Sequence, residues 1–138
     1  MKPHLAIRSF LKKTGLGYEK LKDHGVSLVV PTDKLLIHVA VTAVNNTLAV
    51  LVTLPTVIPN SRKNEFERAF GEFAQQLEWG QIALVENTVH VLVTMGFETD
   101  IIPEQVQLCF EQAFGISSTL CEGVLRWLIT GHTKQTTT

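Results

Sequence analysis

The sequence is poor in charged side chains and has almost no net charge. Of its 138 residues, 18% are Asp, Glu, Lys or Arg, and the formal net charge at pH 7 is −1. A protein that is held to nucleic acid or to an anionic membrane by electrostatic attraction ordinarily carries a clear excess of Lys and Arg. Neither nucleic acid nor a membrane is therefore an expected partner.

Cysteine is also scarce. Cys109 and Cys121 are the two thiols of the chain, and both fall in one C-terminal segment. Their spacing matches neither a zinc knuckle nor a redox-active C-x-x-C motif. If a single helix carries both, the ~1.5 Å rise per residue places them about 18 Å apart, too far for a disulfide. We expect two reduced, buried thiols.

Long apolar runs are missing as well. No stretch approaches the ~18 apolar residues of a membrane-spanning helix, and the apolar part of "MKPHLAIRSFLKKTG" is too short for a secretory signal. A cytoplasmic location is expected. The last residues, "KQTTT", are low in complexity, so we predict one α+β domain over residues 1–130 and a flexible C-terminal tail over residues 131–138.

The short motifs of common catalytic and cofactor sites do not occur. The chain has no G-x-S-x-G, no P-loop, no dinucleotide-binding glycine pattern and no H-E-x-x-H. Two carboxylates, Glu98 and Asp100, stand near a predicted strand end, but neither a base nor a nucleophile is close to them in the sequence. We expect no catalytic residue, no metal site and no cofactor, and hence a protein that is not an enzyme.

The abundant feature is alternation of β-branched and aliphatic residues, above all in residues 25–55. Turn residues at "PTDK" and "NN" divide this stretch into a meander of three strands. If Asn45 and Asn46 form a two-residue turn, Val44 pairs with Thr47 and every pair behind them is fixed. One face of this hairpin is then wholly apolar, whereas the other carries small and weakly polar side chains.

Three further segments follow from periodicity and turn residues. The segment "PHLAIRSFLKKTG" predicts a short amphipathic helix that ends in a left-handed cap at Gly15, and a weak strand signal follows at Tyr18. A second hairpin is predicted from "QIALVE" and "TVHVLVTMGFE", joined at Asn87. After Pro103 the pattern predicts one long helix, or two helices broken near residues 115–118.

A middle helix is predicted between the two hairpins, capped by Asn60 or Ser61 and ended by Gly80. Its large apolar side chains form one stripe: Phe66, Phe70, Phe73 and Leu77. A stripe of this size should be covered by the sheet. We expect Trp79 and Trp127 to end their helices, to be partly exposed and to be candidate interface anchors.

The order of elements is helix, three-strand meander, helix, hairpin and long helix. This order predicts an α+β fold with a five-stranded antiparallel sheet covered by helices on one face. The opposite, mixed face is the candidate partner-binding surface, and its residues are Leu36, His38, Ala40, Thr42, Leu51, Val85, His90, Leu92 and Thr94. A face this apolar is expected to be covered, either by a second subunit or client protein or by part of the last helix.

Two similar strands, "IHVAVT" and "VHVLVT", each place a His four positions before a Thr on the mixed face. If one strand separates them, the backbones of His38 and His90 stand ~10 Å apart, which is marginal for a shared metal ion. We interpret the repeat as two strands that obey one face pattern, with neutral imidazoles bonded to Thr or water.

Five segments of the chain, together with the order of elements, carry a family resemblance: "GVSLVVP", "LAVLVTLP", "IPNSRKNEFERAF", "LEWGQIALVENTVHVLVTM" and "IIPEQVQLCFEQAF". On these the chain resembles the YbjN-like family of bacterial sensory-transduction regulators. The resemblance implies the fold of the type III secretion chaperones, which act as homodimers and hold extended segments of effector proteins.

The resemblance and the absence of catalytic motifs together favour a non-enzymatic protein-binding regulator or chaperone-like module. We expect it to act as a homodimer through the sheet face and helices, and to bind a client or regulatory protein. The alternative is a protein that binds a small apolar ligand or haem between sheet and helices, with His38 or His90 as a polar contact.

Overall fold

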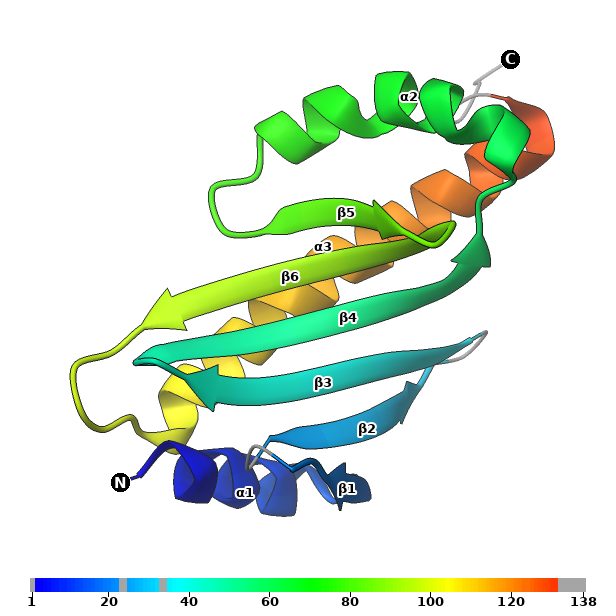
Figure 1. Ribbon diagram of the computed structural model, residues 1–138. Helices are drawn as coiled ribbons and strands as arrows, with labels where there is room; N and C mark the ends of the chain where they lie inside the picture. Colours follow the sequence, from blue (N-terminus) through cyan, green and yellow to red (C-terminus); the bar gives the residue numbers. More distant parts are fainter. Residues whose placement is uncertain (1, 23–24, 33–34, 132–138) are drawn as a thin grey trace.

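The structure is a computed structural model that describes residues 2–22, 25–32 and 35–131. Three helices and six strands form an α+β fold (Figure 1). Their bounds are α1 Pro3–Thr14, β1 Tyr18–Lys20, β2 Val26–Pro31, β3 Leu36–Val44, β4 Thr47–Val57, α2 Lys63–Gln75, β5 Gln81–Val85, β6 Thr88–Gly96 and α3 Pro103–Thr130, with a 3-10 turn, η1, at Asn60–Arg62.

The sheet is antiparallel throughout and has the order β1-β2-β3-β4-β6-β5. It has six strands, so the prediction of five was wrong by one. The additional strand is β1, which pairs with β2 over only three residues, and all three side chains are exposed. A strand this short and this exposed has no alternation of buried and exposed positions, so its sequence pattern is weak.

The predicted register of the central hairpin is confirmed. Val44 pairs with Thr47, and the two turn residues Asn45 and Asn46 have φ of 52° and 60°. Positive φ at both positions defines the primed turn whose twist matches that of the strands. The second hairpin turns in the same way, with positive φ at Glu86 and Asn87.

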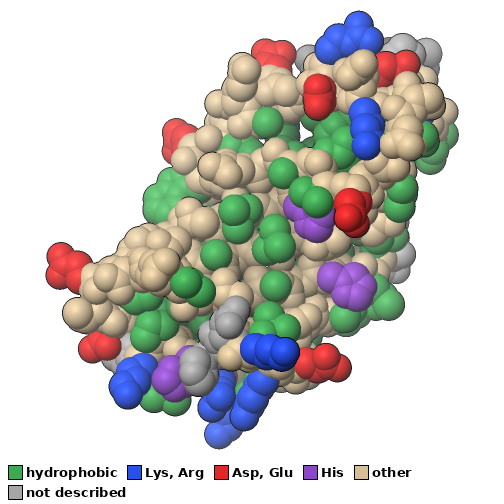
Figure 2. Space-filling model, in the orientation of Figure 1, with side chains coloured by type: hydrophobic (Ala, Val, Ile, Leu, Met, Phe, Trp, Pro, Cys, Tyr) green, Lys and Arg blue, Asp and Glu red, His purple; other side chains and the backbone are tan. Residues whose placement is uncertain are grey.

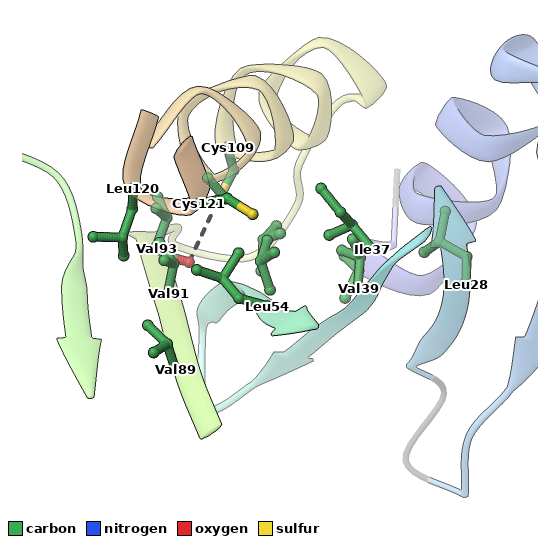
Figure 3. Packing of buried hydrophobic residues seen from close by; sticks show 14 of the residues in the cluster. Leu28, Ile37, Val39, Leu54, Val89, Val91, Val93, Cys109, Leu120 and Cys121 are labelled. Carbon is green, nitrogen blue, oxygen red and sulfur yellow. Dashed lines mark hydrogen bonds between the residues drawn. The ribbon is translucent and has the colours of Figure 1, made fainter. Parts of the chain in front are cut away.

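One face of the sheet is buried under α3, as predicted. Valine and leucine side chains from the central strands point toward this helix (Figure 3). The helix is continuous from Pro103 to Thr130. Within it, Gly115 is exposed and the Ser117 hydroxyl donates a hydrogen bond of 2.6 Å to the Ala113 carbonyl. The buried side chains of α1, namely Ala6, Ile7, Phe10 and Leu11, complete this side of the core.

The middle helix, α2, does not lie on the sheet, so the expected sheet cover for its aromatic stripe was wrong. It lies beyond the β5 edge, beside the C-terminal part of α3 (Figure 1). Phe66 and Phe70 pack on Trp127, with ring centroids 5.9 and 5.8 Å away. The stripe therefore finds its partner on a helix, through the edge-to-face contacts that aromatic rings favour.

Arg62 joins the start of α2 to the end of α3. Its guanidinium lies 4.1 Å from the Trp127 ring centroid, and its two terminal nitrogens donate to the carbonyls of Leu128 and Trp127 at 3.2 and 3.4 Å. The last carbonyls of a helix have no partner in the helix and carry partial negative charge. Arg62 therefore adds a favourable charge at the C-terminus of α3 as well as a cation–π contact.

The ends of α2 differ from the prediction. Neither Asn60 nor Ser61 caps the helix with its side chain, because both belong to η1. The helix ends at Gln75, five residues before Gly80, and Trp79 therefore lies in the loop that follows. The predicted caps of the other helices are confirmed, with Gly15 left-handed after α1 and Pro103 at the start of α3.

Residues 132–138 of the predicted C-terminal tail lie outside the described residues. The first tail position, Gly131, is the left-handed cap of α3, and its N–H donates to the Trp127 carbonyl at 2.7 Å.

We predict that Asn46→Val lowers the free energy of unfolding by about 1–2 kcal/mol, because a β-branched side chain is strained at positive φ. Asn46→Gly serves as the control and should be at least as stable as the original chain. Urea unfolding followed by circular dichroism measures both. Equal stability of the valine and glycine variants would contradict the primed turn.

We predict that Arg62→Ala loosens α2 selectively. Loss of the cation–π contact and of three hydrogen bonds, to the Leu128 and Trp127 carbonyls and to the Glu65 carboxylate, should cost about 1–3 kcal/mol. Amide hydrogen exchange should accelerate in α2 more than in β3 and β4. Arg68→Ala, at an exposed position of the same helix, is the matched control and should leave the exchange pattern unchanged. A uniform acceleration over the whole chain would refute the local role.

Candidate functional site: the open face of the sheet

The face of the sheet turned away from α3 is here named the open face. The alternation of each strand places on it the nine residues of the predicted partner-binding surface. Additional positions on the same face are Val29, Val44, Ala49, Thr53 and Val57. Figure 2 views the molecule from this side, in the orientation of Figure 1.

The open face carries almost no charge. Among the strand residues that point to it, Glu19 at the outer edge is the one with an ionised side chain. The middle of the face consists of Ala40, Leu51 and Leu92, which lie side by side on β3, β4 and β6 and are half-buried by their neighbours. A water-exposed sheet face ordinarily carries charged or strongly polar side chains, so this one has the composition of a contact surface.

Aliphatic side chains toward the margins of the open face are strongly exposed. Their exposed fractions range from 40% to 64%, for Val29, Leu36, Val44, Val57 and Val85. Single exposed aliphatic residues are normal in proteins, but several on one uncharged face form a patch.

The two histidines lie in one row across the sheet. Thr53 of β4 pairs with His38 on one side and with His90 on the other. The Thr53 hydroxyl and His90 Nδ1 are 3.2 Å apart, so they share a hydrogen bond, and His38 is exposed. One strand therefore separates the histidines, as predicted, and their backbones are ~10 Å apart.

Among the described residues, no group of three or more His, Cys, Asp or Glu side chains is placed to hold a metal ion. The hydrogen bond with Thr53 satisfies one polar atom of the half-buried His90 imidazole.

The last helix does not fold over the open face. Its buried side chains contact the opposite face, where the Cys109 thiol lies 3.6 Å from the Val93 carbonyl (Figure 3). Of the two covers considered for the mixed face, cover by α3 was therefore wrong. A second subunit or a client protein stays as the prediction.

The side chains of His38 and His90 cannot line a pocket between the sheet and the helices. Such a pocket would lie on the α3 side, which the core side chains fill, whereas His38 and His90 point to the other side. The prediction that either histidine would contact a small ligand or haem between the sheet and the helices was wrong, because the alternation of side chains along each strand points both histidines away from the helices.

The two tryptophans have different environments. Trp79 is 46% exposed and stays a candidate interface anchor, whereas Trp127 is 4% exposed. The expected exposure of Trp127 was wrong, because this ring is enclosed by Phe66, Phe70 and Arg62.

Several surface grooves could not be recognised in the sequence, because each lies between separate elements of the fold. One lies between α2 and α3 and is lined by Phe70 and Leu120 among others. Another lies between the start of β3 and α3 and includes Cys121 in its lining. A further groove lies between α1 and β1, has a volume of about 600 Å³, and is lined by Arg8 and Lys12 together with apolar side chains.

Both thiols are free and buried, as predicted. Burial raises the pKa of Cys109 to about 11, since the thiolate would lose its hydration. Burial also raises the pKa of Cys121, and the nearby Glu122 carboxylate adds to the shift. Thiols with a raised pKa are poor nucleophiles and poor metal ligands.

Comparison with family models and with curated proteins found no match. Among the described residues, no helix combines the length and hydrophobicity of a membrane span. Solved structures do match. The structure of YbjN from E. coli, a proposed transcription regulator, superposes with a TM-score of 0.67 at 12% identity, over 89% of this chain and 92% of that one.

Two further structures are similar over most of their length. A chain of the ExsC–ExsE complex has a TM-score of 0.59 at 12% identity and covers 88% of this chain and 96% of that one. The Yersinia pestis type III secretion chaperone SycH, solved with a stable fragment of YscM2, has a TM-score of 0.55 at 15% identity, with 85% and 98% covered.

The chain has the fold of YbjN and of type III secretion chaperones. The fold implied by the sequence resemblance is confirmed. At these identities the similarity shows a shared order and packing of elements.

We predict slow reaction of both thiols with a disulfide reagent in the native protein. At pH 8 the Cys109 thiol, whose pKa is about 11, is ionised in about one molecule in a thousand, and burial also limits access to it. Burial raises the pKa of Cys121 as well, so its reactive thiolate form is also disfavoured. Unfolding in urea should release two rapidly reacting thiols. Rapid labelling of Cys109 without urea would show that α3 does not cover the sheet as described, because this thiol contacts the Val93 carbonyl of β6.

Proposed function

We propose that the protein is a non-enzymatic, protein-binding module of the chaperone or regulator type, and that it acts as a homodimer in the cytoplasm. The observation that carries this proposal is the open face. It combines exposed aliphatic side chains with a single charged residue at the edge, and no described helix covers it. Contact with another protein would remove this apolar area from water at a gain of about 25 cal/mol per Å².

The similar structures support protein binding as the general role. Two of the three contain a protein partner, ExsE in one and a fragment of YscM2 in the other. The fold therefore supports protein recognition in those cases. Transfer of that role to this chain depends on the open face, because fold alone does not carry function.

The homodimer is proposed to use the open face and the adjoining helices. The half-buried centre around Ala40, Leu51 and Leu92 provides a flat apolar middle, and the exposed aliphatic residues around it provide the contacts that a partner would bury. Trp79 lies in the loop before β5 with half of its surface exposed, and large aromatic side chains in such positions often anchor interfaces.

The test of the proposed function is the mass in solution. Light scattering at micromolar concentration should give twice the chain mass of 15.3 kDa. Ala40→Glu places a charge at the centre of the open face and should weaken dimerisation by at least about tenfold, since a carboxylate would lose its hydration on burial.

Gln112→Glu, at an exposed position of α3, is the matched control and should leave the mass unchanged. Thermal unfolding of both variants verifies that the fold is retained. A monomer at all accessible concentrations would refute the homodimer, and a dimer that tolerates Ala40→Glu would show that the open face is not its contact surface.

A further inference from the structure

The cationic side chains are concentrated at one end of the chain. Residues 2–22 contain six of the twelve Lys and Arg residues but one carboxylate, Glu19. The six are Lys2, Arg8, Lys12, Lys13, Lys20 and Lys22. The near-zero net charge of the whole chain therefore conceals a basic N-terminal part and an acidic remainder.

The fold keeps these cations together. α1 and β1 lie side by side at the β1 edge of the sheet (Figure 1), and Lys and Arg side chains gather at that end of the molecule (Figure 2). The apolar residues of α1 are buried against the core, so the cations of the helix remain at the surface. Among the described residues, neither Arg8 nor Lys12 has a carboxylate partner.

Two of the cations line a concave surface. We name the groove of about 600 Å³ between α1 and β1 the basic groove, defined by Arg8, Lys12, Leu16 and Tyr18. Arg8 and Lys12 are one helical turn apart and therefore project on the same side of α1. Leu16 and Tyr18 add apolar surface between these charges and the edge of the sheet.

We propose that the basic groove binds an acidic segment of a protein partner, with carboxylates on Arg8 and Lys12 and an apolar side chain against Leu16 and Tyr18. The occupant is chosen by charge complementarity, since two cations with no carboxylate partner in the described part of the chain, set beside apolar surface, fit a segment that combines acidic and apolar residues. This inference rests on the proposed function, and it specifies the chemistry of the partner.

Two other polyanions fit the observations less well. An anionic membrane would be bound through an amphipathic helix whose apolar side enters the lipid, but Ile7, Phe10 and Leu11 of α1 are committed to the core. A nucleic acid would be held mainly through its phosphates, which gain nothing from contact with Leu16.

The groove does not overlap the open face. In β1, Glu19 points to the open face, whereas Tyr18 and Lys20 point to the opposite side. A segment in the basic groove therefore leaves the open face available to a second subunit.

The test uses a short fluorescent peptide rich in Glu and Asp with interspersed Leu and Phe, and a counterpart in which Gln and Asn replace the acids. Fluorescence anisotropy should show binding of the acidic peptide at low ionic strength, weaker binding with added salt, and binding of the neutral counterpart that is at least about tenfold weaker.

Arg8→Glu/Lys12→Glu should weaken binding of the acidic peptide by at least about tenfold. Lys63→Glu/Arg68→Glu changes the same residue types on α2 and should leave binding within about twofold. Should the double reversal lower the stability of α1, Arg8→Gln/Lys12→Gln removes the charge with residues of good helix propensity and should have the same effect in reduced degree.

Equal binding of the acidic and neutral peptides, or equal loss in the two double variants, would overturn the inference. So would tighter binding of duplex DNA or of phosphatidylserine vesicles that depends on the same two cations. Ala40→Glu, which tests the open face, should leave peptide binding within about twofold, so that failure of the proposed homodimer and failure of the basic groove are distinguishable.

Discussion

The primed turn at Asn45 and Asn46 is the constraint on which the rest of this fold depends. Because side chains alternate along a strand, a shift of one residue at the turn would exchange the two faces of the sheet. With the observed register, Val39, Val41 and Val52 enter the core, and Ala40, Thr42 and Leu51 stay on the open face. The open face exists as a distinct surface because this register holds.

The positions of the helices are a second constraint, because they decide which face of the sheet is covered. α3 spans one face as a single helix, and α1 packs beside it. α2 is held at the side by Arg62 and Trp127, so it does not shield the sheet. One face is therefore core, and no described helix covers the other.

Charge is also distributed unevenly over the surface of the molecule. The open face is nearly uncharged, whereas residues 2–22 contain half of the Lys and Arg residues, and two of these, Arg8 and Lys12, line a groove. A whole-chain net charge of −1 provides no general attraction to polyanions. It does not exclude a local site, since fields at protein surfaces are screened within about 10 Å.

The sequence by itself determined the strands of both hairpins, their register, the mixed character of the open face and the buried thiols. The strands, their register and the mixed face follow from local rules, namely the period of two along strands and the turn geometry that Asn residues tolerate. β1 was the exception, because three exposed residues carry no alternation to read.

Only the tertiary structure decided what each surface packs against. The stripe of Phe66 and Phe70 showed that one side of α2 must be buried, but any apolar surface could bury it. The observed partner, Trp127, is about sixty positions away in the sequence. The same holds for the basic groove, which forms between a helix and a strand. The hydrophobic effect is not directional, so a sequence pattern identifies the buried side of an element without identifying its partner.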